Sequence, residues 1–207
     1  RRFKNALSEV NSSIFYALKA NFNSNILRIF SEIGAGVDVV SKGEIELALS
    51  SGIKPNKIVF SGVGKTREEI SFAIKKNILQ LNVESVEELE EIEVLMKSVK
   101  KKNIEISLRV NPDVDANTHK KISTGRSEDK FGIPLHKVLG IFKKFRRNSN
   151  INITGLAVHI GSQITTIKPF EVAFQKLRKL ILKLKQQGFN IYKVDLGGGI
   201  GIIYSNN

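Results

Sequence analysis

Short apolar runs alternate along the chain with segments of amphipathic helical pattern, and this alternation limits the possible folds more than any other feature. The apolar runs, which are predicted strands, are Ile14–Ala20, Val37–Val40, Lys57–Ser61, Ile78–Val83, Ile104–Val110, Ile153–Ile160 and Ile191–Leu196. The predicted helices between them are Ser24–Ile33, Gly43–Ser51, Thr66–Lys76, Ser85–Lys101, Leu135–Arg146 and Pro169–Gln187. Strict alternation of this kind predicts a parallel sheet whose strands are covered by helices.

Several predicted helices carry signals for their ends. The stretches that begin at Thr66 and Ser85 each place a glutamate three residues later, which is the pattern of a capping box. Gly34 and Gly188 stand where helices are expected to stop. These signals support the helix boundaries independently of the apolar periodicity.

Two architectures fit the alternation, an open doubly wound sheet and a (β/α)8 barrel of about 250 residues. With 207 residues, the chain is long enough for one domain. A barrel needs eight strand-helix units, and the pattern supplies about seven strands and six helices, so on that interpretation the barrel is incomplete. The segment Asn111–Pro134 has no clear periodicity and is too long for an ordinary connection, which is typical of a functional loop.

Composition restricts the function classes. The absence of cysteine excludes disulfides and thiolate metal ligands and suits a cytoplasmic protein. No apolar run approaches the roughly 20 residues that span a bilayer, so we expect no membrane association. The net charge of +13 raises nucleic acid as a partner. We expect none, because the basic residues fall late in predicted helices and the acidic residues early, which complements helix dipoles.

Polar and glycine-rich features gather where the predicted strands end. They are Lys19, Asp38, Arg109 with Asn111, His159 with Gly161, Ser162 and Gln163, and Asp195 with Gly197, Gly198 and Gly199. In parallel α/β folds the carboxyl ends of the strands form the active-site face. The sequence therefore predicts a site at that edge of the sheet.

Each feature taken alone has an ordinary structural explanation. Lys19 closes an uncharged run, so it is either a candidate Schiff-base nucleophile or a lysine that extends to solvent. The glycines at 197–199 are either a phosphate-binding loop or a plain turn. His159 is a base, a ring that stacks on a cofactor, or a core histidine, and no partner at metal-ligand spacing accompanies it, so no metal is expected.

Six motifs in order carry a resemblance to a known family. They are Phe15 to Asn21, Gly36 to Glu44, Arg109 to Pro112, Thr124-Gly125 with Lys130 to Ile133, His159 to Gln163, and Asp195 to Gly199. Together they resemble the fold-type III pyridoxal-phosphate-dependent decarboxylases, which have an alanine-racemase-like (β/α)8 barrel. The resemblance covers nearly the whole chain and implies that residues 1–207 are a partial cofactor-binding barrel domain, without the family's C-terminal β-domain.

Within the family, the Asn-Pro after Arg109, the Thr-Gly and Lys-Phe-Gly-Ile segment and Gln163 resemble the diaminopimelate decarboxylase branch. That likeness implies a carboxy-lyase that converts meso-diaminopimelate to L-lysine and carbon dioxide, the last step of lysine biosynthesis.

The resemblance also implies a role for each candidate residue. Lys19 would bind pyridoxal phosphate covalently, and His159 would stack on its ring; these two are the expected catalytic residues. Ser162 with Gly197, Gly198 and Gly199 would hold the phosphate. Asp38, Glu44 and Arg109 would line the cofactor pocket.

Several parts of the family pattern are not found in the 207 residues. They are the Glu-Pro-Gly-Arg segment, the substrate-binding arginines and tyrosine, and the Cys-Glu pair that the family contributes across a homodimer interface. We therefore expect a homodimer only in a longer form and no decarboxylation by these 207 residues alone. The remaining alternatives are a decarboxylase for ornithine, arginine or carboxynorspermidine, a racemase, and a barrel that binds pyridoxal phosphate without turnover.

Overall fold

The computed structural model describes residues 2–98, 103–115, 131–147 and 150–202. Its contacts divide the chain into two compact units. The first comprises Arg1–Asn82 and Val94–Lys100, and the second comprises Val83–Glu93 and Lys101–Asn207. Three residues of the sequence motifs, Thr124, Gly125 and Lys130, lie outside the described residues.

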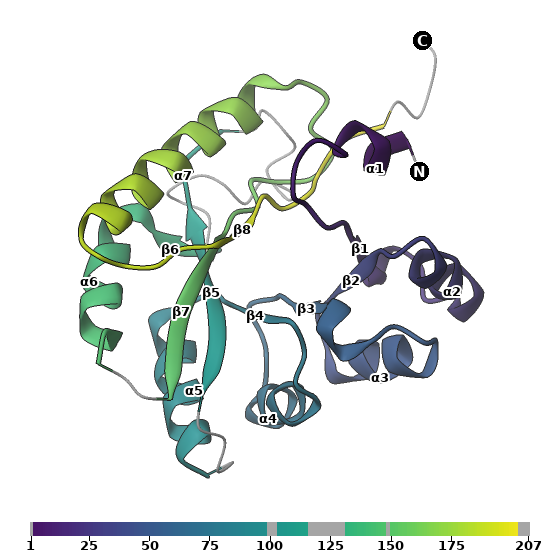
Figure 1. Ribbon diagram of the computed structural model, residues 1–207, viewed down its shortest axis with the longest axis horizontal. Coiled ribbons are helices and arrows are strands. Elements are labelled where there is room, and N and C mark those ends of the chain that lie inside the picture. Colours follow the sequence, from purple (N-terminus) through teal and green to yellow (C-terminus); the bar gives the residue numbers. More distant parts are fainter. Residues whose placement is uncertain (1, 99–102, 116–130, 148–149, 203–207) are drawn as a thin grey trace. The chain divides into compact units, whose positions relative to one another are not determined.

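The first unit is a parallel sheet with helices between its strands (Figure 1). Its strands are β1 (Phe15–Ala17), β2 (Gly36–Val39), β3 (Ile58–Phe60) and β4 (Gln80–Val83). Each pairs in parallel with the next, with Ala17 opposite Asp38 and Asp38 opposite Val59. Its helices are α1 (Arg2–Ala6), α2 (Ser24–Glu32), α3 (Lys42–Ser50) and α4 (Arg67–Lys76), with short 3-10 turns at η1 (Leu18–Ala20) and η2 (Pro55–Lys57). Figure 1 shows α2, α3 and α4 side by side along one face of these strands.

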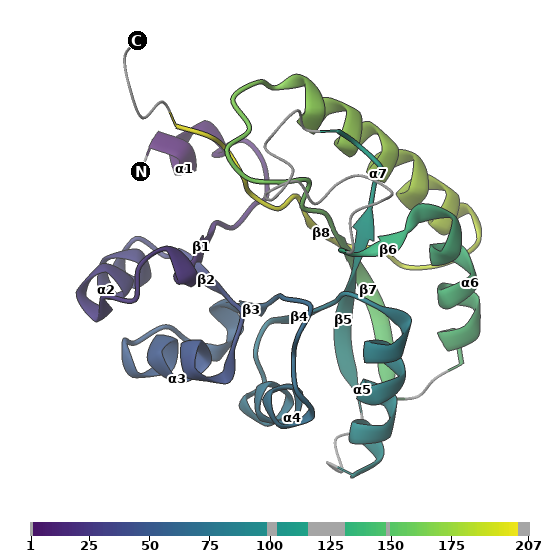
Figure 2. The same ribbon diagram turned by 180° about the vertical axis from the view of Figure 1, so that it is seen from behind.

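The second unit contains β5 (Ile104–Asn111), β6 (Ile133–Pro134), β7 (Ile151–Ala157) and β8 (Lys193–Asp195). β5 pairs in parallel with β7, and β7 with β8, while the two residues of β6 join the end of β5. The helices here are α6 (Leu135–Phe145) and α7 (Lys168–Gln186), which Figure 2 shows from behind. α5 (Val86–Ser98) belongs to this unit up to Glu93.

The pairing within each unit decides between the two architectures. In both units, successive βα units place their strands next to each other in chain order. A doubly wound sheet reverses its strand order at a switch point, whereas the strands of a (β/α)8 barrel follow the chain. The observed order is therefore that of the barrel class.

All seven predicted strands and all six predicted helices are present, and the differences lie at their ends. The first strand was expected to run from Ile14 to Ala20, but it stops at Ala17 because residues 18–20 turn into η1. The predicted loop Asn111–Pro134 ends in β6, where Val110 pairs with Ile133. The sequence did not predict α1, which buries none of its residues and so has no apolar stripe to reveal it.

The expected helix ends are found with one change. Thr66 and Glu69 form the complete capping box of α4. At α5 the Ser85 hydroxyl accepts from the Glu88 amide, but the Glu88 carboxylate accepts from the amide of Glu84, one residue earlier than predicted. Gly34 and Gly188 have φ values of +78° and +79°, the left-handed conformation that ends a helix.

The core of each unit comes from its most buried strands and from one stripe of the helices that pack on them, whereas β1 and β8 are only half-buried and α1 buries no residue. In the second unit α7 buries Ala173, Leu177, Leu180 and Leu184, which follow the helical period. Most residues of β5 and β7 are buried, Leu108 and Leu156 fully, and α6 packs against both strands. This packing fixes the carboxyl ends of the strands, where the candidate residues lie.

The Glu105 carboxylate near the amino end of β5 predicts a loss of stability in acid. Hydrogen bonds from Tyr192, at 2.5 Å, and Lys193, at 2.9 Å, lower the pKa of Glu105 below its ordinary value. A lowered folded-state pKa stabilises the protein above the unfolded pKa, and this contribution is lost as pH falls through the folded value. Glu105 is partly exposed, so we expect it to contribute less than about 1 kcal/mol. Tyr192→Phe should therefore flatten the fall of unfolding free energy below about pH 4.3, measured by urea denaturation across pH. An unchanged pH slope would contradict this assignment.

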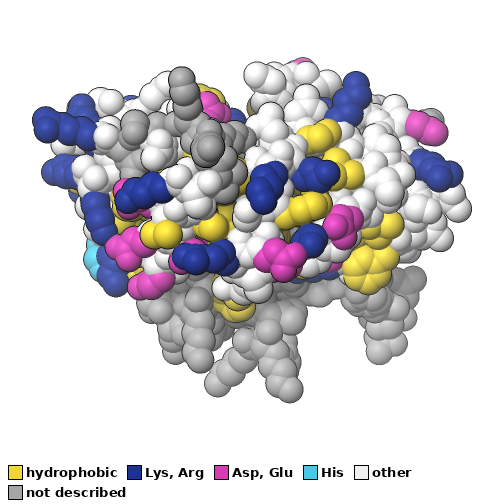
Figure 3. Space-filling model, turned by 90° about the horizontal axis from the view of Figure 1, so that it is seen from below, with side chains coloured by type: hydrophobic (Ala, Val, Ile, Leu, Met, Phe, Trp, Pro, Cys, Tyr) yellow, Lys and Arg dark blue, Asp and Glu magenta, His cyan; other side chains and the backbone are white. Residues whose placement is uncertain are grey.

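The high net charge does not form one continuous basic surface on the face drawn in Figure 3, where Lys and Arg side chains are interspersed with Asp and Glu. Among the described residues, no helix is both long enough and apolar enough to cross a membrane.

Candidate functional site

The turn after β1 presents Lys19. Lys19 lies in η1, two residues beyond the last residue of the strand, and is exposed. The amide of Asn21 donates to the Leu18 carbonyl at 3.0 Å, and the Asn21 side chain accepts from the Asn23 amide at 2.9 Å. Asn23 in turn caps α2. The asparagines therefore fix the backbone that carries Lys19 to the carboxyl end of the first unit's sheet.

Asp38 is held by a chain of polar side chains across three neighbouring strands. The Ser61 hydroxyl donates to Oδ1 of Asp38 at 2.7 Å and accepts from Nδ2 of Asn82 at 3.0 Å. Asn82 is buried and also accepts from Nε2 of Gln80 at 2.8 Å. Buried polar groups of this kind fix a geometry because a broken link leaves another group unsatisfied. Asp38 therefore has a defined position within the first unit.

Glu44 connects a strand to the helix that follows it. Its side chain is 8% exposed, and Oε2 accepts from the amide of Val40 at 2.8 Å, just after β2. Its own amide donates to the capping hydroxyl of Ser41 at 3.2 Å. Glu44 thus fixes the turn that follows β2, the strand that carries Asp38.

Breaking the polar chain at its centre should cost stability. Ser61→Ala removes the donor to Asp38 and the acceptor for Asn82, which we expect to lower the unfolding free energy by about 1–3 kcal/mol. Ser50→Ala is the matched control, since among the described residues that exposed hydroxyl donates only to the Leu47 carbonyl of its own helix. Urea denaturation of both variants measures the difference, and equal losses would show that the chain does not stabilise the fold.

In the second unit, Arg109 lies between an acid and an aromatic ring. Its Nη1 is 2.9 Å from both carboxylate oxygens of Glu84, and the two side chains are 12% and 3% exposed. Its Cζ stands 5.5 Å from the ring centre of Phe131. Asn111, the last residue of β5, holds the backbone of Phe131 in place, because its Nδ2 donates to the Phe131 carbonyl at 3.2 Å.

A glycine loop follows β8 and lies against His159. The Gly198 amide donates to Nδ1 of His159 at 3.4 Å, and the Gly197 amide donates to Oδ1 of Asp195 at 2.8 Å. Gly197 and Gly199 have φ values of +71° and +96°. A Cβ at Gly199 would overlap the carbonyl oxygen of Gly161, so the backbones approach too closely for any side chain there.

The segment after His159 packs along the same loop. The Ile164 amide donates to the Gly199 carbonyl at 2.9 Å, and the side chain of Gln163 accepts from the Ile202 amide at 3.1 Å. Ser162 lies between His159 and Gln163 in the chain and is half-buried. The structure therefore places His159 and the segment that follows it against the glycine loop, and the binding roles of His159, Ser162 and the glycines stay predictions.

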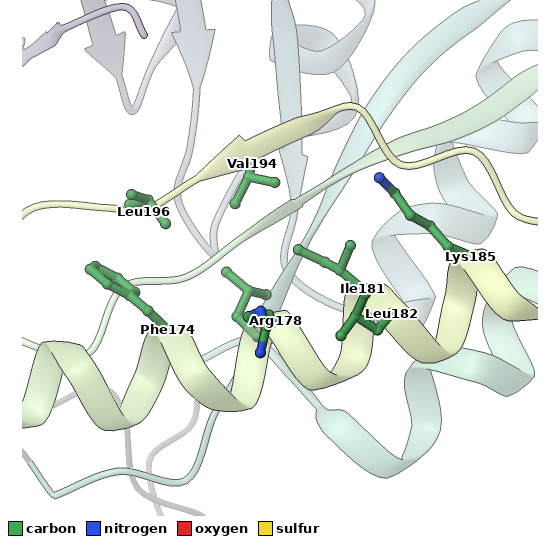
Figure 4. A pocket seen from close by; sticks show the side chains of 8 residues that line it. Phe174, Arg178, Ile181, Leu182, Lys185, Val194 and Leu196 are labelled. Atoms are coloured by element: carbon green, nitrogen blue, oxygen red, sulfur yellow. The ribbon is translucent and has the colours of Figure 1, made fainter. Parts of the chain in front are cut away.

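The second unit also has a groove between α7 and β8, shown in Figure 4, with a volume of about 230 Å³. Phe174, Ile181, Val194 and Leu196 point into it from the helix and the strand. It holds no predicted site residue, and its polar lining consists of Arg178 and Lys185 at its margin. Its apolar walls offer no acid or base for a reaction.

Three residues of the strand ends were not identified from sequence. Ser61 follows β3, Asn82 lies in β4, and Glu84 follows β4. All three share the signal used for the other candidates, a polar side chain where a strand ends. Glu84 was missed because it directly precedes a helix-start pattern, which accounted for the acidic residues around it.

A model of one protein family matches residues 1–207, and its description is the pyridoxal-binding domain of pyridoxal-dependent decarboxylases. The chain belongs to the pyridoxal-dependent decarboxylases. The expected cofactor, pyridoxal phosphate, is thereby confirmed as that of the family's domain.

Individual relatives agree with this family. A diaminopimelate decarboxylase from Zymomonas mobilis is 44% identical over 100% of this chain and 50% of its own length. The crystal structure of diaminopimelate decarboxylase from Helicobacter pylori with L-lysine has a TM-score of 0.95 and 44% identity, covering 99% of this chain and 52% of that one. A lysine decarboxylase from Selenomonas ruminantium, at 23% identity and a TM-score of 0.79, shows the fold alone. The barrel fold is confirmed, and the chain spans about half the length of the curated relatives it matches.

The residues of this decarboxylase domain fit a phosphate ester. The positive φ values at Gly197 and Gly199 turn the backbone, and only glycine can approach Gly161 so closely. Glycine loops of this kind let backbone amides reach phosphate oxygens. Ser162 is half-buried and directly follows Gly161, and it adds a hydroxyl donor.

Proposed function

We propose that this chain is the pyridoxal-binding part of an enzyme that removes one carboxylate of meso-diaminopimelate and yields L-lysine and carbon dioxide. The observation that carries the proposal is the match of the family domain to all 207 residues, with relatives named diaminopimelate decarboxylase at 44% identity. The Asn111-Pro112 pair and Gln163, which distinguish this branch from the ornithine and arginine enzymes in the sequence motifs, support the same substrate.

Each candidate residue has a proposed task. Lys19 binds the cofactor through its Nζ, and the fixed turn of η1 holds it at the strand end. His159 packs against the cofactor ring, with its orientation set by the Gly198 amide. When bound, pyridoxal phosphate takes up the electron pair left by the departing carbon dioxide.

The phosphate and the polar pocket complete the assignment. Gly197, Gly198, Gly199 and Ser162 hold the phosphate: Gly199 and Ser162 donate from an amide and a hydroxyl, while Gly197 and Gly198, whose amides donate to Asp195 and His159, shape the loop. Arg109 donates to a cofactor oxygen, and Asp38 and Glu44 orient the neighbouring groups. Asp38 is fixed by Ser61 at 2.7 Å and Glu44 by Val40 at 2.8 Å, so neither needs to reorganise when the cofactor binds.

We further propose that the longer protein is a cytoplasmic homodimer that binds neither nucleic acid nor membrane. The lack of cysteine supports the cytoplasm, and the interspersed charges on the face drawn in Figure 3 argue against nucleic acid. The homodimer is what the family resemblance implies.

The substrate assignment is tested with the longest reading frame that contains this chain. The purified protein, loaded with pyridoxal phosphate, is given meso-diaminopimelate, ornithine or arginine, and carbon dioxide and product amine are measured. We expect turnover of meso-diaminopimelate to exceed that of the other two amino acids by at least about 100-fold. Preference for ornithine or arginine would move the protein to another branch of the family. Bound cofactor without turnover of any of the three would support the non-catalytic barrel.

Running the same assay on the 207-residue chain tests our expectation that these residues alone are inactive.

A further inference from the structure

An ion pair in the second unit is buried more deeply than stability alone explains. Both oxygens of Glu84 are 2.9 Å from Nη1 of Arg109, and the Glu84 side chain is only 3% exposed. Removing two charges from water is costly, and apolar residues of the same size often serve a core equally well. A buried ion pair at this position therefore indicates a functional role for Glu84 or Arg109.

Glu84 stands on a rigid junction between β4 and α5. Its amide donates to Oε2 of Glu88 at 2.9 Å, and the Ser85 hydroxyl accepts from the Glu88 amide at 3.1 Å. The backbone of Glu84 is thus held by the Glu88 side chain, and Glu88 is in turn held by the Ser85 hydroxyl. A carboxylate on such a support can hold a partner in one orientation.

Arg109 is restrained on a second side as well. The Phe131 ring lies 5.5 Å from its Cζ, and Asn111 ties the Phe131 carbonyl to the end of β5 at 3.2 Å. Nη1 is engaged by Glu84, while Nε and Nη2 donate to no acceptor among the described residues. The guanidinium is planar, so fixing one nitrogen and one face determines where the other donors point.

We propose that Glu84 is a positioning residue of the cofactor site, which holds Arg109 so that Nε and Nη2 are presented to an oxygen atom of pyridoxal phosphate. This inference rests on the proposed place of Arg109 in the cofactor pocket. Glu84 itself does not touch the cofactor and acts through Arg109. Its role is therefore separable from the identity of the amino-acid substrate.

A double-mutant cycle on cofactor affinity tests the inference in the longest reading frame that contains this chain. Glu84→Gln keeps the size of the side chain and removes its charge, and we expect pyridoxal phosphate to bind about tenfold more weakly. Glu84→Asp, which keeps the charge, should recover most of this loss. Arg109→Gln should weaken binding at least as much. The double variant should bind no more weakly than Arg109→Gln alone, because the guanidinium that Glu84 positions is already gone.

Glu90→Gln is the matched control, since Glu90 lies on α5 and pairs with Lys144 at 2.6 Å while about half exposed. It should leave cofactor affinity unchanged. The absorption spectrum of the bound cofactor adds a readout that a purely structural pair would not alter. It should shift alike in Glu84→Gln and Arg109→Gln and stay constant in Glu90→Gln.

Two results would overturn the inference. One is wild-type affinity and spectrum in folded Glu84→Gln. The other is a double variant whose fold loss of cofactor affinity equals the product of the two single losses, which would show that Glu84 acts independently of Arg109. If Glu84→Gln does not fold, Glu84→Asp and the double variant, in which no buried charge lacks its partner, decide the question. Cofactor affinity is measured without substrate, so failure of the diaminopimelate assignment leaves this test intact.

Discussion

Replacing Lys19 with alanine is expected to abolish covalent attachment of pyridoxal phosphate. Lys19 is the lysine that the motif places at the cofactor, and η1 holds it just beyond the end of β1. A Schiff base needs an amine, and alanine offers none. The measurement is borohydride reduction of the protein mixed with the cofactor, followed by mass-spectrometric mapping of modified lysines. The wild-type protein should carry one dominant adduct on Lys19, and Lys19→Ala should carry none above background.

Lys54→Ala provides the control for this experiment. Lys54 is also exposed and precedes a 3-10 turn, but it lies before β3 and so at the opposite edge of the first unit's parallel sheet. It should leave the adduct on Lys19 unchanged. The reduction is made both on the 207-residue chain and on the longest reading frame that contains it. An adduct only in the longer protein would mean that the site needs further residues. Scattered adducts in both would refute the assignment of Lys19.

Much of the fold could be predicted because periodicity reports burial, and burial is what forms these elements. β3 is buried at all three residues, and its apolar run was visible in the sequence. β6 was not, because two residues that end in Pro134 have no period to detect. Its pairing with β5 depends on long-range contacts such as Val110 with Ile133, which no local pattern contains.

The candidate site divides in the same way. Lys19, Asp38 and His159 could be proposed because polar side chains at strand ends stand out against apolar runs. Their partners could not, because a hydrogen bond between Ser61 and Asp38 joins residues 23 positions apart in the chain. The ion pair of Glu84 with Arg109 spans 25 positions and is decided only when the strand ends are arranged in space. Sequence thus predicted the groups, and the structure supplied the contacts that hold them.

Gly199→Ala is expected to impair both the loop after β8 and its binding of the cofactor. The φ of +96° strains any residue with a Cβ, at a cost of about 1–3 kcal/mol. The added methyl group would also overlap the carbonyl oxygen of Gly161, which the neighbouring backbone cannot easily move. We expect a lower thermal midpoint without cofactor and affinity for pyridoxal phosphate weaker by at least about tenfold, or 1.4 kcal/mol.

Gly198→Ala distinguishes strain within the chain from contact with the ligand. A Cβ at Gly198 meets no heavy atom within 4 Å, and its φ is not positive. Its thermal midpoint without cofactor should therefore match that of the wild-type protein. Equal destabilisation by Gly198→Ala and Gly199→Ala would contradict the close approach to Gly161. If Gly198→Ala keeps its midpoint but binds pyridoxal phosphate more weakly, the loss comes from contact with the cofactor itself, because the loop has no other atom for the methyl group to meet.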